Sequence, residues 1–530
     1  MYPSRGPILH RELSSRLLSG FCSCPLRPSI CHEIENIPRS TTTGMKISAV
    51  LAASLAALSS MAQAAETIHA VVTVQRHGDR TFKGNPPTSL TSLGQLQCHN
   101  AGVFYRKRYI ATSSEHYIDG ISESLFNDKQ VYAMAPDQPL LVTSAQVFLQ
   151  GLYPPTTSNK TKSLANGQVV EDPVNGLQYT TLHSMATTDP NTIWLKGDDE
   201  CPNFLVQSNA YMESQDYLRL NQESQAFYNS LKRDYLNGVF QDDKVGYQNA
   251  YPIFDYINVG SVHNATIANR ISRGELYKLK VLADHHEWAI SGNASSEHPA
   301  LTIAGKGMAF KIAERLSVNL QTAGKQNKFT LMISSYDAFL GFFGHVGLSA
   351  YSPDFMGLPN YAASMVFEMF SDGDTPAGKY PTESALKVRF LFRNGTESDV
   401  PLTSFPIFGQ TELTWKEFNE KIDAFAVKNI NDWCTLCSSS GPFCPANANS
   451  NDVKSNAHNQ PLSPGAAGAV GVVCTIAAIL LGLGVAMAVF GVRFGRSKKA
   501  TKEESLNEKL SSEPDLTGME TPPEVFTSKA

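Results

Sequence analysis

The sequence predicts an α/β domain with an open mixed sheet flanked by helices, a mostly helical second lobe, and one transmembrane helix outside that domain. Short apolar runs rich in β-branched residues alternate with longer helix-type patterns, which is typical of an α/β sheet. The stretch between about residues 155 and 300 has few strand signals, so we interpret it as the helical lobe. Two apolar segments, one before the first predicted strand and one after the last predicted strand, flank all of these patterns. We therefore place the folded domain at residues 66–440.

Four short segments have the composition of β-strands. Residues 68–74 are almost continuously apolar and β-branched, as a strand buried on both faces requires. Residues 329–333, 364–370 and 386–390 predict further strands, and the last of these alternates apolar with polar side chains. These strands supply the sheet.

Three segments between the strands predict helices. The first follows Ser92-Leu-Gly-Gln95, a capping-box pattern that marks a helix start. Residues 144–152 predict the second helix, and residues 304–316 predict a third with apolar positions at helical spacing. Helices placed between strands are expected to cover the faces of the sheet.

The first apolar segment begins at Met45 and has the features of a secretory signal peptide. A basic residue, a short apolar stretch and an Ala-x-Ala end follow one another, and cleavage is expected after Ala64 or Ala65. A buried helix is the alternative. We interpret residues 1–65 as an upstream extension plus signal peptide, with Met45 as the true start.

The second apolar segment, residues 466–492, is long enough to cross the hydrocarbon layer as one helix. The basic residues just after it predict a cytoplasmic tail at residues 493–530. Residues 441–465 are rich in Pro, Asn, Ser, Ala and Gly and predict a stalk. The chain is therefore expected in a membrane as a single-pass protein. Its N-terminal domain would lie outside the cytosol, at the cell surface or in a secretory or vacuolar lumen.

The charge balance and the glycosylation signals agree with a protein that passes through the secretory pathway. Lys plus Arg total 44 and Asp plus Glu total 49, a formal net charge of −5, so nothing points to nucleic acid. Sequons for N-glycosylation lie outside the predicted tail. They begin at Asn159, Asn264, Asn293 and Asn394.

The predicted domain and stalk together have five cysteines, so at least one cannot pair with another of them. These are Cys98, Cys201, Cys434, Cys437 and Cys444. The spacing of Cys434 and Cys437 also fits a metal or redox pair. Because no second pair of Cys or His stands at zinc spacing, we favour disulfides, although the sequence leaves their connectivity open.

The strongest chemical signal is Arg76-His77-Gly78-Asp79-Arg80 at the C-terminal end of the first predicted strand. Ligands of open α/β sheets bind beyond the carboxyl ends of strands. Two guanidinium groups suit an anionic phosphoryl group, and an imidazole can attack phosphorus. The alternative is a surface loop whose charges are solvated.

The pentapeptide resembles the Arg-His-Gly-x-Arg-x-Pro signature of the histidine acid phosphatases, the phytase-containing branch of the histidine phosphatase superfamily. Three further segments resemble motifs of that family and occur in the family's order. They read Leu-Thr-Ser-Leu-Gly-Gln-Leu-Gln at residues 90–97, Ser-Ala-Gln-Val-Phe-Leu-Gln-Gly at residues 144–151 and Tyr-Ala-Ala-Ser-Met-Val-Phe-Glu at residues 361–368. The resemblance covers about residues 68–440.

The resemblance implies hydrolysis of a small phosphorylated substrate in two steps. His77 would be the nucleophile that becomes phosphorylated. Arg76 and Arg80 would clamp the phosphoryl oxygens, and Asp337 would protonate the leaving oxygen. The scheme needs no metal and no organic cofactor.

Two positions depart from the family's pattern. Tyr336 stands where the family has the His of a His-Asp pair, and it either donates one hydrogen bond to substrate or packs as an aromatic side chain. Leu140 stands where the family has a further phosphate-binding Arg. Loss of such a donor typically costs about 2–4 kcal/mol of transition-state stabilisation, which weakens a catalyst without silencing it.

The sequence predicts no metal or catalytic site at three other histidines. His285 and His286 are adjacent, and neighbouring residues of a helix point apart, so we expect a solvated helical face rather than a metal site. His263 precedes a sequon, which favours a surface position.

Two functions follow from these features. The first is a phosphoric monoester hydrolase of the acid phosphatase type, with a phosphohistidine intermediate. The alternative is a catalytically weak or inactive surface glycoprotein that binds phosphorylated ligands, as Leu140 and Tyr336 suggest. The retained His77 and Asp337 favour hydrolysis, because a binding protein needs neither. Substrate identity and oligomeric state stay open.

Overall fold

The computed structural model describes residues 66–373 and 379–445. The predicted signal segment, the transmembrane segment 466–492, the tail and all of the stalk beyond residue 445 lie outside these ranges. Within them, no helix combines the length and the apolar character needed to cross a bilayer.

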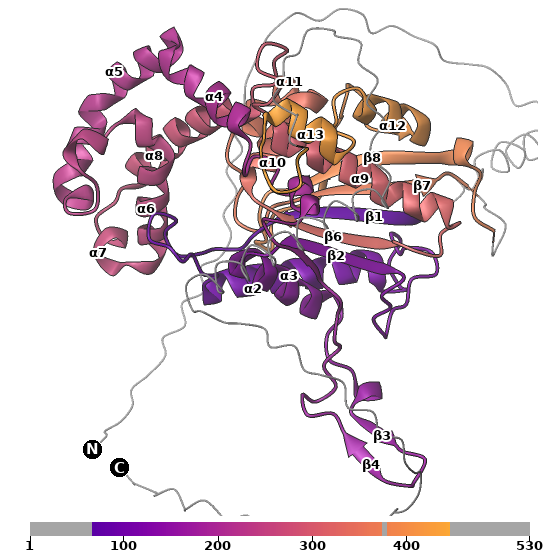
Figure 1. Cartoon of the computed structure of the whole chain (residues 1–530). Helices are drawn as coiled ribbons and strands as arrows, with labels where there is room; N and C mark the ends of the chain where they lie inside the picture. The colour runs from indigo at the N-terminus through magenta and orange to yellow at the C-terminus, as the bar shows by residue number, and fades with distance from the viewer. Residues whose placement is uncertain (1–65, 374–378, 446–530) are drawn as a thin grey trace, which may run out of the picture. The chain divides into compact units, whose positions relative to one another are not determined.

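One mixed sheet organises the domain (Figure 1), with strands in the order β10-β8-β7-β1-β6-β2-β5 and β9 paired to β8. β1 pairs in parallel with β6, β6 with β2, and β2 with β5, whereas β7 runs antiparallel to β1 and to β8. The predicted open mixed sheet is therefore confirmed. The strands are β1 Thr67–Arg76, β2 Val131–Pro136, β5 His183–Met185, β6 Phe329–Ser334, β7 Ser364–Ser371, β8 Leu386–Arg393, β9 Thr403–Ser404 and β10 Leu413–Thr414.

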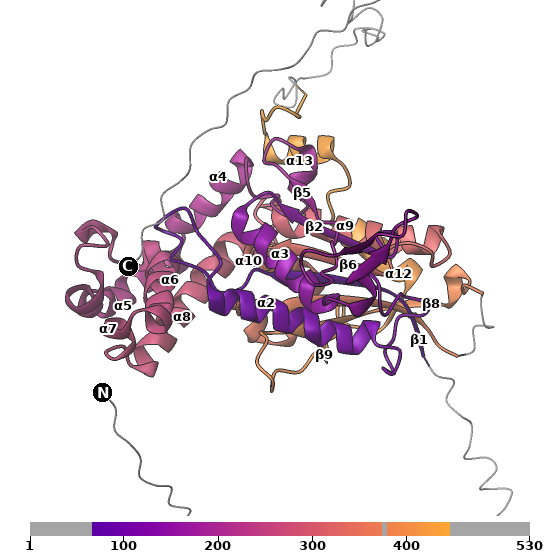
Figure 2. The same ribbon diagram turned by 90° about the horizontal axis from the view of Figure 1, so that it is seen from below.

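Helices cover both faces of this sheet (Figures 1 and 2). α2 (Ser92–Tyr105) and α3 (Pro139–Leu152) pack on one face, and α9 (Ile303–Gln321), α10 (Tyr336–Val346) and α12 (Trp415–Asp423) pack on the other. Alternation along β6 divides the interior into two cores. Leu331 and Ile333 belong to the core under α2 and α3, and Met332 belongs to the opposite core.

The helices between residues 202 and 287 form the predicted second lobe, and the last four of them share a core of their own. They are α4 Pro202–Ala210, α5 Gln215–Leu231, α6 Ala250–His263, α7 Ala265–Ala268 and α8 Arg273–Glu287. The segment 155–300 also contains three strands that its composition did not predict. β3 (Thr161–Ser163) and β4 (Val169–Glu171) form a hairpin that extends away from the domain (Figure 1), and β5 joins the edge of the main sheet. Strands of three residues are too short to show a period.

Two predicted helix starts were wrong. The N-cap of α2 is Thr91, whose hydroxyl accepts a hydrogen bond from the Gly94 amide at 3.1 Å, so the predicted capping box at residues 92–95 is not formed. α3 begins at Pro139 rather than at Ser144. Proline suits the first turn because its missing N–H has no partner there anyway, and the Ser144 hydroxyl donates to the Leu140 carbonyl within the helix.

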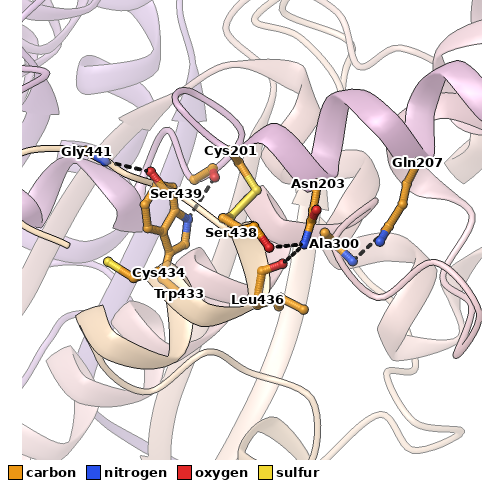
Figure 3. The surroundings of a disulfide bond; sticks show 12 residues. Cys201, Asn203, Gln207, Ala300, Trp433, Cys434, Leu436, Ser438, Ser439 and Gly441 are labelled. Atoms are coloured by element: carbon orange, nitrogen blue, oxygen red, sulfur yellow. Dashed lines mark hydrogen bonds between the residues drawn. A yellow bond between two sulfur atoms is a disulfide. The ribbon is translucent and has the colours of Figure 1, made fainter. Parts of the chain in front are cut away.

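A disulfide between Cys201 and Cys437 holds helix α13 (Ile430–Cys437) to the segment before α4 (Figure 3). A second disulfide joins Cys434 to Cys444 just after the same helix, and Cys98 is a buried free thiol. The disulfide interpretation of the Cys434 and Cys437 pair is confirmed, although each bonds to a different partner. Disulfides are typical of proteins that fold in an oxidising compartment.

Candidate active site

Three parallel strands end at the same edge of the sheet and bring the motif residues together. Arg76 pairs with Ser334 in the register of β1 and β6, so His77 and Ser335 both begin the turns that leave this edge. The chain after β2 lies beside them and leads into α3. A cavity of about 220 Å³ opens here, which we call the His77 cavity. Its lining includes His77, Arg80, Leu140, Lys196, Asp199 and Tyr336.

His77 is held as a neutral imidazole with one nitrogen free. Its side chain is 5% exposed, and Nδ1 lies 2.8 Å from the carbonyl oxygen of Gly78, to which it donates. The proton therefore resides on Nδ1, and the lone pair of Nε2 is available for attack. Burial, and after it the charges of Arg76 and Arg80, hold the pKa of His77 well below its ordinary value.

Gly78 allows the motif loop to approach helix α2. A Cβ atom at Gly78 would lie 2.4 Å from the carbonyl oxygen of Gly94, a distance that no side chain permits. The backbone of the motif loop therefore packs directly against α2 at Gly78.

Arg80 points to the His77 cavity, but its terminal nitrogens already have partners. Nη1 donates to the Thr81 carbonyl and to Asp255 Oδ2, both at 2.9 Å. Nη2 donates to the Tyr251 hydroxyl and to Asp255 Oδ1, both at 3.0 Å. Each terminal nitrogen carries two hydrogens. Only the Nε hydrogen of Arg80 is therefore left for a phosphate while Asp255 stays in place.

Arg76 does not share that arrangement. Its guanidinium lies over the ring of Tyr361, 4.6 Å from the centroid, and Nη1 donates to the Pro359 carbonyl. Arg76 lines a different cavity, formed between α6, α8 and the loop before β7. The ring of Tyr336, 5.5 Å from the guanidinium, lines the His77 cavity. Arg76 affects His77 through its charge in this geometry.

Tyr336 is buried, and its hydroxyl donates to Glu287 Oε2 at 2.8 Å. Glu287 Oε1 lies 2.9 Å from Nδ1 of His286, so the phenol belongs to a buried polar chain between α10 and α8. A phenol has one proton to donate. Of the two interpretations of Tyr336, this geometry favours the packed aromatic side chain that lines the cavity.

Asp337 follows in the first turn of α10. Its Oδ2 accepts a hydrogen bond of 2.9 Å from the hydroxyl of Ser335, which lines the His77 cavity. Burial, and after it the charge of Asp198, raise the pKa of Asp337, and Lys196 opposes them. A carboxyl group whose pKa is raised keeps its proton at higher pH, as a general acid requires.

Leu140 is 8% exposed and lines the His77 cavity, so the position of the missing Arg does face the site. Two cations that sequence reasoning missed, Lys83 and Lys196, line the same cavity. Lys83 stands three residues after the motif. Lys196 stands within a Lys-Gly-Asp-Asp cluster, and the charged residues of that cluster were the one signal that could have drawn attention to it.

The carboxylates around Lys196 hold it in its charged form. Lys196 Nζ lies 3.3 Å from both Asp198 and Asp199. Burial lowers the pKa of Lys196, but the charges of Asp198, Asp337 and Asp199 outweigh burial and raise it overall. Asp199 also lines the cavity, and burial raises its pKa, which makes it a second carboxyl group suited to donate a proton.

His263 is exposed, as expected, yet it contacts the motif. Its Nε2 lies 2.6 Å from Oδ2 of Asp79, which also accepts a hydrogen bond from the Thr91 hydroxyl. This contact ties the C-terminal end of α6 to the motif loop. No pattern in the sequence signalled it.

The sequence model of the histidine phosphatase superfamily (branch 2) matches residues 82–393. The chain belongs to that family. The match begins two residues after Arg80, so the branch 2 assignment does not depend on the Arg76–Arg80 motif.

Solved structures with a similar course of the chain include phytases. The Klebsiella sp. ASR1 phytase has a TM-score of 0.47 and 11% identity over 68% of this chain and 97% of that protein. The Citrobacter braakii phytase has a TM-score of 0.45 and 14% identity over 68% and 98%. A Bifidobacterium longum multiple inositol polyphosphate phosphatase in complex with inositol hexasulfate has a TM-score of 0.39 and 12% identity over 69% and 94%.

In the described part of this branch 2 histidine phosphatase, no group of three His, Cys, Asp or Glu side chains is placed to hold a metal ion. His285 is half-exposed, whereas His286 is buried. The solvated-face interpretation is therefore wrong for His286. Its side chain packs against the rings of Tyr211 and Tyr247, which the sequence spacing does not reveal.

Proposed function

We propose that this protein hydrolyses phosphoric monoesters through a phosphohistidine intermediate at His77. The observation that carries the proposal is the state of that imidazole. It is buried, its proton is fixed on Nδ1 by Gly78, and its pKa is lowered among cationic side chains. A neutral imidazole with a free nitrogen, facing a cavity lined by cations, is suited to attack phosphorus.

In the first proposed step, the His77 Nε2 lone pair forms a bond to phosphorus while the bond to the ester oxygen breaks. The leaving oxygen takes a proton from Asp337. In the second step, Asp337 accepts a proton from water, whose oxygen attacks phosphorus and releases inorganic phosphate from His77. Proton donation by a positioned carboxyl group typically contributes about 10²–10⁴-fold to the rate.

The proposed electrostatic stabilisation comes from Arg80, Lys83 and Lys196. They line the cavity in which charge develops on the phosphoryl oxygens. Direct contact of Arg76 and of the Tyr336 hydroxyl with the phosphoryl group remains a prediction from the family resemblance. Their present partners are Pro359 and Glu287.

A catalytically weak phosphate-binding protein is the second candidate. Three observations favour it: Leu140 lines the cavity in place of a cation, the Tyr336 proton is donated to Glu287, and Asp255 occupies the fork of Arg80. Each removes a donor that a phosphoryl group would use. The two candidates differ in whether phosphate ester bonds break.

The test is phosphate release from an aryl phosphate by the full chain, purified from a secretory host, between acid and neutral pH. We expect turnover that His77→Ala lowers by on the order of 10³-fold or more, because the nucleophile is lost. His116→Ala is the control, since His116 lies outside the His77 cavity, with its Nε2 3.4 Å from a carboxylate oxygen of exposed Glu115.

Trapping the intermediate separates the two candidates. Acid-labile, base-stable phosphate should become bound to the wild-type chain and not to His77→Ala. Turnover that persists in His77→Ala would refute the mechanism. Phosphate binding without any turnover would establish the binding protein instead.

We also propose that residues 466–492 anchor the protein in a membrane, with the domain outside the cytosol. The apolar segment, the basic residues after it and the two disulfides support this topology. In sealed vesicles of the secretory pathway, external protease should remove an epitope placed at residue 530 and leave the domain intact. Removal of the domain would contradict the proposal.

A further inference from the structure

A groove lies between helix α8 of the second lobe and the 3₁₀ helix η9 (Pro353–Met356), which comes before β7. We call it the α8 groove. It measures about 660 Å³, within the range of small-ligand sites, and its lining residues differ from those of the His77 cavity. The lining side chains most used below are Tyr277, Val281, Asp284, Trp288, Asp354 and Asn394.

Asn394 lines this groove and begins an acceptor sequence for N-linked glycans, Asn394-Gly395-Thr396. Its side chain is exposed in the loop just after β8. Oδ1 accepts a hydrogen bond of 2.7 Å from the Asn360 amide, and the backbone carbonyl accepts one of 3.0 Å from Asn360 Nδ2. No acceptor for Nδ2 of Asn394 lies among the described residues. A glycan on Nδ2 therefore leaves both hydrogen bonds to Asn360 in place.

The walls of the groove carry apolar surface that the protein itself leaves uncovered. Tyr277, Val281 and Met356 are exposed there, and the ring of Trp288 is only partly buried. Concave sites lined by apolar and aromatic side chains usually bind a ligand. A pyranose ring has a face of C–H bonds that packs against aromatic rings, and hydroxyl groups around its rim. Tyr277 and Trp288 supply rings suited to that face.

The charges in the groove favour a neutral polar occupant over an ion. Lys280 is paired with Asp284 at 2.6 Å, and Asp284 Oδ1 also accepts a hydrogen bond of 2.9 Å from the Leu358 amide. Asp354 and half-exposed His285 are the other titratable side chains of the lining besides Tyr277. Carboxylates accept hydrogen bonds, and an imidazole both donates and accepts them. These groups suit the hydroxyl and N-acetyl groups of a sugar.

The covalent step needs a donor that the secretory pathway supplies, an oligosaccharide linked to a lipid through a diphosphate. A bond forms between Asn394 Nδ2 and C1 of the first N-acetylglucosamine, while the bond from C1 to the diphosphate oxygen breaks. Nδ2 loses one of its two protons. The product is a neutral amide, so the groove gains no charge.

We propose that a glycan on Asn394 lies in the α8 groove, with its first sugar rings against Tyr277 and Trp288. The glycan then joins the second lobe to the loop before β7. This inference rests on the proposed passage through the secretory pathway and is independent of hydrolysis at His77. The occupant follows from the attachment point, because the acceptor nitrogen belongs to a residue of the groove itself.

Enzymatic release of the glycan from the folded chain tests the proposal. The full chain is produced in a secretory host whose mannosidases are inhibited, so that every glycan is a substrate of endoglycosidase H. This enzyme cuts between the first two sugar rings. We expect release from Asn394 to be at least about tenfold slower than from the unfolded chain, because the rings must leave the groove before the enzyme reaches them. Mass spectrometry of glycopeptides resolves the sites.

Asn264 is the matched site within the same chain. It also begins an Asn-x-Thr acceptor sequence, is exposed and lies outside the groove. Its Oδ1 likewise accepts backbone hydrogen bonds, from the amides of Thr266 and Ile267 at 2.9 and 3.4 Å. A glycan there should be released from the folded chain as fast as from the unfolded chain.

Tyr277→Ala should open the groove and make release from Asn394 about tenfold faster, since one stacking ring is lost. Tyr179→Ala is the control, because Tyr179 is 68% exposed, Tyr277 is 70% exposed, and Tyr179 lies outside the groove. The high exposure of Tyr277 means that its substitution removes little packing from the fold.

Thr396→Ala tests the bridge between the two walls. It removes the acceptor sequence and keeps Asn394 with its hydrogen bonds to Asn360, whereas Thr396→Ser keeps the acceptor sequence and is the control. Amides of residues 353–358 should exchange with solvent about tenfold faster in Thr396→Ala than in Thr396→Ser, because the glycan no longer holds this loop to α8.

Three results would overturn the proposal. These are an empty Asn394 beside a glycosylated Asn264 or Asn293, equal release from Asn394 in the folded and the unfolded chain, and equal effects of Tyr277→Ala and Tyr179→Ala. Absence of glycan from every acceptor would refute the secretory route as well. The failure of that route and the failure of the groove inference are therefore distinguishable.

Discussion

Arg80 holds the carboxylate of Asp255 in a fork of two hydrogen bonds, 2.9 and 3.0 Å long, and both side chains are buried. A carboxylate in this fork presents two oxygens to a guanidinium much as a phosphate does. Asp255 also accepts a hydrogen bond of 3.0 Å from the Lys83 amide. A phosphoryl group that binds the terminal nitrogens of Arg80 must therefore displace Asp255.

Asp255→Asn should strengthen phosphate binding. The neutral amide competes less well for Arg80, so we expect the dissociation constant of inorganic phosphate to fall at least tenfold. Without phosphate the variant should lose about 2–3 kcal/mol of stability, because a buried cation loses its counter-ion. Urea unfolding with and without phosphate measures both effects. Asp216→Asn, which breaks an exposed ion pair with Arg219, is the control and should change neither.

Asp337→Asn should lower activity and raise stability at neutral pH. Loss of the proton donor is expected to lower the rate constant by about 10²–10⁴-fold. The pKa of Asp337 is raised in the folded chain, so folding binds a proton there. Stability contributed by Asp337 is therefore present below its unfolded pKa and is lost as pH rises through its folded pKa. The amide side chain of the Asp337→Asn variant does not ionise, so the variant does not lose this stability as pH rises. Thermal unfolding at several pH values measures it.

Asp199→Asn is the comparison for that experiment, because burial raises the pKa of Asp199 as well and Asp199 lines the cavity. If Asp337 is the acid, Asp199→Asn should retain most of the activity and the basic limb of the pH profile. A larger loss in Asp199→Asn than in Asp337→Asn would assign the proton donor to Asp199.

Arg80→Gln should shift the acid limb of activity toward neutral pH. Burial is the main cause of the lowered pKa of His77, and the charges of Arg76 and Arg80 add to it. With Arg80 gone, the imidazole gains its second proton at a higher pH and stops acting as a nucleophile there. The titration of His77 followed by NMR should show the same upward shift. An unchanged titration would mean that the charge of Arg80 does not reach His77.

Leu140→Arg should increase turnover. Leu140 lines the His77 cavity, so a guanidinium at this position can reach a bound phosphoryl group. One added charge-assisted donor is expected to raise kcat/KM roughly 10- to 100-fold. Leu140→Met keeps the apolar volume and is the control. A Leu140→Arg variant that folds but gains nothing would show that Lys83 and Lys196 already supply the charge that the site can use.

Removal of the Cys201–Cys437 disulfide should affect the site as well as stability. The bond closes a loop with a sequence separation of 236, and Trp433 Nε1 donates to the Gly197 carbonyl at 2.9 Å (Figure 3). Both contacts restrain the segment that carries Lys196 and Asp199. The double serine variant should lose about 2–5 kcal/mol of stability and part of its activity.

The Cys434–Cys444 disulfide provides the matched control, because its sequence separation is 10. Its double serine variant should lose less stability and keep more activity, since a shorter loop restrains the unfolded chain less. Equal losses in the two variants would contradict the positional role of the Cys201–Cys437 bond.

The sequence by itself determined four strands of the main sheet and the order of the family motifs, and it predicts His77 as the nucleophile. Continuous apolar runs such as residues 68–74 and 329–333 predict buried parallel strands, because such strands must be apolar on both faces. Parallel strands end at one edge, and the family resemblance predicts Asp337 opposite His77. The register of β1 and β6 places Arg76 beside Ser334, so the turns that carry the two residues leave the sheet as neighbours.

Only the tertiary structure decided what surrounds these residues. Lys196 and Tyr251 reach the His77 cavity, and Asp255 reaches Arg80, from elements far along the chain, and no local period or spacing encodes such contacts. Arg76 and Arg80 looked equivalent in the motif. They face different cavities because the chain turns between them, and side-chain direction after a strand end depends on packing against the second lobe rather than on sequence spacing.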